Sequence, residues 1–92
     1  MEYERVLIFC NRKSASYWFD KMIKFFKERN FFVRAYRGTN MIIVNNRITY
    51  FKANKEINEA FTRGRHKAMY YYCAEKQLEE KFLGTIEELI NG

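Results

Sequence analysis

The sequence has no proline, one histidine, two cysteines and four glycines among its 92 residues. Without proline no stiff linker divides the chain, so we expect one domain over residues 1–92. The two cysteines, Cys10 and Cys73, do not form a disulfide framework, and they predict free thiols in a reduced, cytoplasmic compartment. The single histidine leaves too few ligands for a structural zinc site. We therefore expect neither a metal nor a cofactor.

Long apolar runs are also missing. No stretch approaches the roughly 20 apolar residues of a membrane-spanning helix, and no charged-then-apolar leader opens the chain, so we expect no membrane partner. Apolar side chains are nevertheless plentiful, at 48% of the sequence, with nine Phe, seven Tyr and one Trp. Aromatic side chains bury the most apolar area per residue. This composition predicts a folded domain rather than a disordered chain.

Acidic residues are scarce over most of the chain. The net charge is +6, and residues 1–67 carry fifteen basic and six acidic side chains, whereas residues 68–92 carry two and five. A basic body with an acidic end predicts a polyanion partner, either DNA or RNA, or else an acidic protein surface.

The first half of the chain predicts a strand, a helix and a hairpin. Residues 5–10 are apolar on both faces, which is typical of a strand in a parallel α/β sheet. Residues 15–29 form an amphipathic pattern that predicts a helix, with Ser14 or Ser16 as its N-cap and Asn30 at its end. Further elements are a β-favouring stretch at 31–37, a turn at 38–40, and hairpin arms at 41–44 and 48–52.

The second half predicts a short exposed helix within 53–63, a basic loop at 63–67, and an interior strand at 68–73. A helix over 68–83 is the alternative for that last run, because no strong helix breaker interrupts it. The final residues predict a helix that Gly84 interrupts, with a capping box at Thr85–Glu88. The fold class is therefore a small α/β protein of two or three layers, in the order βαβββ(α)βα. Its sheet is partly parallel, and it contains a β-hairpin and a C-terminal helix.

This order of elements resembles part of a RecA-like P-loop ATPase core, such as those of phage large-terminase and helicase motors. The matching stretches are an opening strand at 6–10, two strands at 41–44 and 47–51, an Arg-Gly segment at 62–65, and an apolar strand at 69–75 that ends in Glu75. The resemblance implies an α/β fold built around a parallel sheet.

Two parts of the motor machinery are missing from the sequence. No G-x-x-x-x-G-K-[ST] loop is present to hold nucleotide phosphates. The acid that would coordinate Mg²⁺ after the apolar strand is replaced by Cys73 and Ala74. Phosphoryl transfer depends on both parts, and no catalytic triad is recognisable, so we expect a protein that is not an enzyme and has no catalytic residues.

Basic side chains are the best candidates for a binding site. Arg12 and Lys13 follow the first strand, at the sheet edge where open α/β sheets bind their ligands. Arginine forks match phosphate and protein carboxylates equally well, so both kinds of partner stay open. The further residues predicted to contact nucleic acid are Arg34, Arg37, Arg47, Arg63, Arg65, His66 and Lys67.

The sequence thus predicts a small, phage-like, non-enzymatic protein that binds DNA or RNA phosphates through a basic surface. One alternative is a phage-encoded inhibitor or anti-defence protein, for example anti-CRISPR-like, that docks on a host enzyme or nucleoprotein. Another is a split ATPase that borrows its nucleotide site from a second chain. The sequence predicts no oligomeric state.

Overall fold

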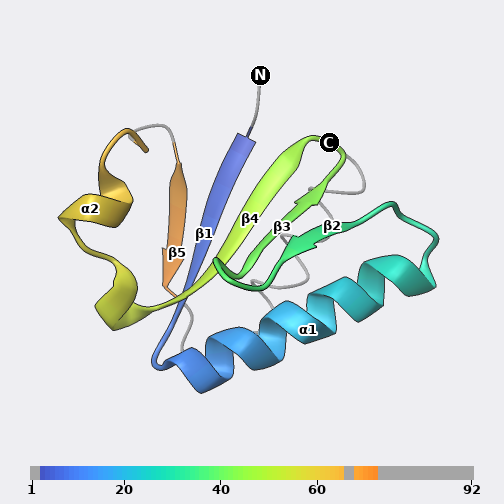
Figure 1. Cartoon of the computed structure of the whole chain (residues 1–92), viewed down its shortest axis with the longest axis horizontal. Helices are drawn as coiled ribbons and strands as arrows, with labels where there is room; N and C mark the ends of the chain where they lie inside the picture. The colour runs from blue at the N-terminus through green and yellow to red at the C-terminus, as the bar shows by residue number, and fades with distance from the viewer. Residues whose placement is uncertain (1–2, 66–67, 73–92) are drawn as a thin grey trace.

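A computed structural model of the chain describes residues 3–65 and 68–72. The described part forms a five-stranded mixed sheet in the order β2-β3-β4-β1-β5, with the helix α1 lying along one face (Figure 1). Strand β1 is parallel to β4 and to β5, whereas β2, β3 and β4 form an antiparallel meander. The elements are β1 Tyr3–Phe9, α1 Arg12–Glu28, β2 Arg34–Tyr36, β3 Met41–Val44, β4 Arg47–Ala53, η1 Asn54–Glu56, α2 Glu59–Thr62 and β5 Met69–Tyr72.

The main core lies between α1 and the sheet. Alternate residues of a strand point to opposite faces, so β1 directs Leu7 and Phe9 toward α1, and β4 adds Phe51. The Phe19 ring of α1 meets Phe51 edge-on, with 5.8 Å between the ring centroids. The buried members of this core are Leu7, Phe9, Ala15, Phe19, Met22, Phe26, Ile42, Val44 and Phe51.

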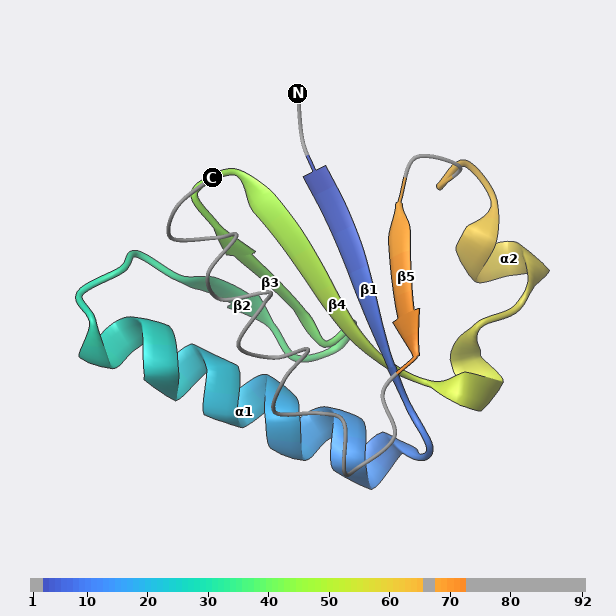
Figure 2. The same ribbon diagram turned by 180° about the vertical axis from the view of Figure 1, so that it is seen from behind.

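A smaller core covers the opposite face of the sheet. Val6 and Ile8 of β1 lie there beside Ile48 and Tyr50 of β4, and Phe61 of α2 packs against them. The segment that contains η1 and α2 lies beside β5, away from α1, in both views (Figures 1 and 2). Strand β1 is therefore covered on both faces, which confirms the prediction from its two-sided apolar run.

Asparagine fixes several of the chain reversals. Asn30 ends α1 in the left-handed conformation with φ 63°, as predicted. The β3–β4 hairpin has a two-residue turn in which Asn45 and Asn46 have φ 52° and 63°. Both central residues of a type I′ turn need positive φ, so this turn matches the twist of its strands and confirms the predicted hairpin.

The predicted start of the first helix was wrong. Asn11, rather than Ser14 or Ser16, is the N-cap, because its Oδ1 accepts a hydrogen bond from the Ser14 amide at 2.8 Å. The helix therefore begins at Arg12, a turn closer to the end of β1 than the amphipathic pattern indicates.

Two other elements differ from the prediction in detail. The stretch predicted as β-favouring at 31–37 pairs only over β2, and the predicted short helix is divided between η1 and α2. Within the predicted run at 68–73, Met69–Tyr72 forms the strand β5 rather than a helix. Among the described strands β5 pairs only with β1, so it lies at the edge of the described sheet rather than in its interior, and its Tyr70 packs against the smaller core. The predicted C-terminal helix and Cys73 lie outside the described residues.

Candidate nucleic-acid interface

The parallel strands β1 and β4 end at the same level of the sheet, because Phe9 and Ala53 are register partners. We call this end of the sheet the carboxyl edge. The chain leaves it in two directions, from β1 into α1 and from β4 into η1. Side chains from both connections therefore meet at this edge, as the sequence predicts for Arg12 and Lys13.

The pKa of Lys52 responds to two other cations: Arg12 at the carboxyl edge, and Arg65 in the loop before β5, whose first residue pairs with Arg5 toward the other end of the sheet. Burial lowers the pKa of Lys52 below its ordinary value; Glu56 raises it, and the positive charges of Arg12 and Arg65 lower it further. The Glu56 carboxylate is held in place because its Oε1 accepts a hydrogen bond from the Ala53 amide at 2.9 Å. We call Arg12, Lys52 and Arg65 the carboxyl-edge cluster.

The ring of Phe61 supports two members of this cluster. The Arg65 guanidinium carbon lies 4.4 Å from the Phe61 ring centroid and 5.2 Å from that of Tyr50. The Lys52 Nζ lies 5.5 Å from the same Phe61 ring. Both cations are attracted to the electron-rich faces of these rings, so the rings hold like charges near one another.

Hydrogen bonds also fix the Arg65 side chain. Its Nη1 donates to the backbone carbonyl of Phe61, and its Nη2 donates to the Tyr50 hydroxyl at 3.5 Å. The hydrogen bond to Tyr50 is the main cause that raises the pKa of Arg65. Arg65 is thus a positioned cation rather than a freely rotating one.

The start of α1 adds a second basic region next to the cluster. Arg12 and Lys13 are exposed, and the first turn of the helix contains no acidic residue. A hollow of about 460 Å³ opens here, lined by Asn11, Lys13, Ser14, Tyr17 and Trp18. The amide groups of a first helical turn and nearby cations both favour anions, so this region suits a phosphate.

The other predicted residues lie apart from the carboxyl edge or are engaged elsewhere. Arg37 forms an ion pair with Asp20 of α1, with 2.6 Å between Nη1 and Oδ1. Arg34 on β2 and Arg47 at the start of β4 lie toward the opposite end of the sheet, as the strand registers require. Arg63 is exposed just after α2, and His66 and Lys67 lie outside the described residues.

The structure therefore brings Arg12 and Lys13 to the carboxyl edge, places the Arg65 side chain on the ring that Lys52 also contacts, and separates Arg34 and Arg47 from that edge. Lys52 is a member of the cluster that the sequence did not indicate. The position of Lys52 near the end of β4 is a weak signal in the sequence, because the ring that it contacts, Phe61, comes from the later helix α2.

The remaining chemistry at this edge is limited. Cys10, just after β1, is a free thiol as predicted, and its side chain is exposed. Across residues 3–65 and 68–72, no group of three His, Cys, Asp or Glu side chains is placed to hold a metal ion. No helix in that same part of the chain is long and apolar enough to cross a membrane.

No family model, curated protein or solved structure matches this chain.

Proposed function

We propose that this protein binds DNA or RNA in the cytoplasm by contacting phosphates at the carboxyl edge, and that it catalyses no reaction there. The observation that carries the proposal is the carboxyl-edge cluster, in which Lys52 and Arg65 share the Phe61 ring and the charges of Arg12 and Arg65 both lower the pKa of Lys52. A group of like charges is electrostatically unfavourable alone, and a phosphate placed among them relieves the repulsion.

The proposed mechanism is electrostatic. Each cation that neutralises a phosphate releases condensed counterions, so affinity falls as the salt concentration rises. Phosphate contacts carry no base information, so the binding is weakly selective for sequence. The exposed Arg12 and Lys13 supply such contacts at the carboxyl edge, and the fixed Arg65 supplies one from the loop before β5.

The salt dependence of binding tests this proposal. We compare the wild type with a double variant, Arg12→Gln with Lys13→Gln, using a short fluorescent oligonucleotide and measuring affinity over a range of salt. Each lost phosphate contact lowers the magnitude of the slope of log affinity against log salt by about 0.7–0.9, so the double variant should lose about 1.4–1.8.

A matched double variant, Lys24→Gln with Lys27→Gln, removes the same charge from the other end of α1, about 20 Å away. It should keep nearly the wild-type slope, because Lys24 is already paired with Glu28, with 4.0 Å between Nζ and Oε1. Equal slopes for both double variants would show that net charge alone drives binding and would refute the proposed interface.

The inhibitor-like function is a second candidate, and a different surface favours it. Phe32 is 81% exposed just before the edge strand β2, and Tyr36 within that strand is 45% exposed. Exposed rings beside a strand that is at the edge of the described sheet favour protein docking. This candidate predicts a one-to-one complex with a purified host protein. The complex should survive nuclease treatment and should be lost in Phe32→Ser. A complex that Phe32→Ser does not weaken would count against this candidate.

A further inference from the structure

A cation, a ring and a second cation follow one another along the exposed side of α1. Lys13, Tyr17 and Lys21 are four residues apart, a spacing that places side chains on the same helix face. All three are exposed, and Tyr17 retains 50% of its accessible surface. A large aromatic side chain left in water between two lysines is available to a ligand.

Neighbouring side chains hold the Tyr17 ring in place. The Trp18 ring meets it edge-on, with 5.3 Å between centroids and an interplanar angle of 77°. The Lys21 Nζ lies 5.1 Å from the Tyr17 centroid and 5.7 Å from that of Trp18. Trp18 itself packs against the main core, so it anchors the pair to the body of the protein. The ring is therefore oriented before any ligand arrives.

Tyr17 also borders the hollow at the start of α1. That hollow measures about 460 Å³, and Lys13 and Trp18 are among its lining residues. Its volume falls within the range of roughly 300–1,000 Å³ that is usual for small-ligand sites. It combines a positive charge, hydrogen-bonding side chains and two aromatic rings, which together suit a nucleotide better than a bare phosphate.

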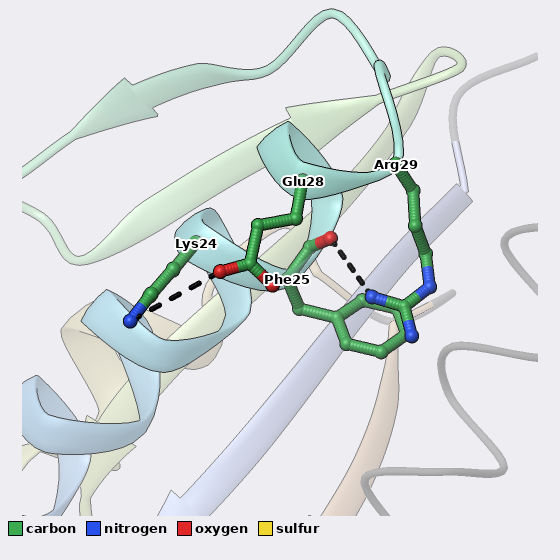
Figure 3. A network of polar contacts seen from close by, with 4 residues as sticks. All are labelled: Lys24, Phe25, Glu28 and Arg29. Carbon is green, nitrogen blue, oxygen red and sulfur yellow. Dashed lines mark hydrogen bonds and ion pairs between the residues drawn. The ribbon is translucent and has the colours of Figure 1, made fainter.

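The next ring along the same helix face is already engaged. The Arg29 guanidinium carbon lies 3.4 Å from the Phe25 ring centroid. The Nη1 of Arg29 also donates a hydrogen bond to the Phe25 backbone carbonyl at 3.3 Å (Figure 3). Beside it, Lys24 is paired with Glu28. The alternation of cations and rings thus continues along α1, and each ring has a cation beside it. Arg29 lies 3.4 Å from the Phe25 centroid, whereas Lys21 lies 5.1 Å from that of Tyr17, and Tyr17 is the more exposed of the two rings.

We propose that Tyr17 is a base-stacking residue and that this protein prefers single-stranded to double-stranded nucleic acid. The inference rests on the proposed function and names its substrate class. Bases and phosphates alternate along a single strand, and the Lys13–Tyr17–Lys21 row offers a ring between two cations. In a duplex the base faces are stacked on one another, so Tyr17 has no partner there. Aromatic stacking of single-stranded bases tolerates any sequence.

The test compares single-stranded and duplex oligonucleotides of equal length, using the wild type and Tyr17→Leu. Loss of one stacked base should weaken single-strand affinity by about 5- to 100-fold and leave duplex affinity unchanged. Tyr17→Phe keeps the ring and should retain single-strand affinity. Tyr36→Leu is the matched control, because Tyr36 is 45% exposed on β2, outside the Lys13–Tyr17–Lys21 row, and should change neither affinity.

The outcomes separate this inference from the proposed function. Suppose that the wild type binds in a salt-dependent way. If Tyr17→Leu then has no effect, or lowers the affinity for single strand and duplex equally, the stacking role alone is overturned. Absence of salt-dependent binding to either oligonucleotide would overturn the proposed function, and the stacking role with it. Quenching of the single Trp, Trp18, by a single strand but not by a duplex would further support stacking at this ring pair.

Discussion

Phe61→Leu tests how far one ring supports the candidate interface. Leucine keeps most of the apolar volume that packs on the smaller core but removes the aromatic face. The ring contacts that are lost are the edge-on pair with Tyr50, at 5.4 Å and 88°, and the cation contacts of Arg65 and Lys52, at 4.4 and 5.5 Å.

The expected loss of stability follows from these contacts. A partly exposed cation–π contact contributes about 0.5–1 kcal/mol, and an aromatic pair about 0.5–1.5 kcal/mol. The contacts share one ring and are not fully additive, so we expect the free energy of unfolding to fall by about 2 kcal/mol. Domains of this kind are stable by about 5–15 kcal/mol, so the variant should still fold.

Urea unfolding followed by Trp18 fluorescence measures this loss. With an m-value of about 1–2 kcal/mol per M, the unfolding midpoint should fall by about 1–2 M. Phe32→Leu is the matched control, because Phe32 is 81% exposed and its substitution should change stability by less than about 0.5 kcal/mol. Equal midpoints for the two variants would refute the supporting role of the Phe61 ring.

Three further outcomes are expected. The folded-state pKa of Lys52 is lowered below its ordinary 10.5, so its unfavourable effect on folding is fully present at neutral pH. The free energy of unfolding should rise as the pH passes upward through that folded-state pKa toward 10.5, and in urea titrations Lys52→Gln should remove this part of the rise. Arg37→Gln breaks the exposed pair with Asp20 and should cost at most about 1 kcal/mol, less at high salt; a larger loss by urea titration would contradict a surface pair. Asn46→Val places a β-branched side chain at φ 63° and should cost about 1–2 kcal/mol in thermal unfolding, whereas Asn46→Gly should be tolerated; equal midpoints would argue against the turn.

The local parts of the fold were predictable because their signals lie close together in the sequence. The period of apolar residues identifies the buried face of α1, including Phe19, Met22 and Phe26. Asn45 and Asn46 identify the hairpin through their tolerance of positive φ. These elements depend on near neighbours, so no knowledge of distant contacts is required.

The arrangement of the candidate interface was less predictable because it depends on distant contacts. The parallel register of β1 and β4 brings Arg12 near Lys52, and the Phe61 ring of α2 brings the Lys52 and Arg65 side chains together. The same registers send Arg34 and Arg47 to the other end of the sheet. Charge type alone identifies candidates, whereas strand register decides which of them meet.

Backbone amide shifts during titration with a single-stranded oligonucleotide test the central claim most directly, because they locate the contact on the protein. We expect the largest shifts at Arg12, Lys13, Lys52 and Arg65, and we expect them to diminish as salt is added. Shifts confined to β2, at Arg34–Tyr36, with none at the end of β1 and β4, would contradict the account.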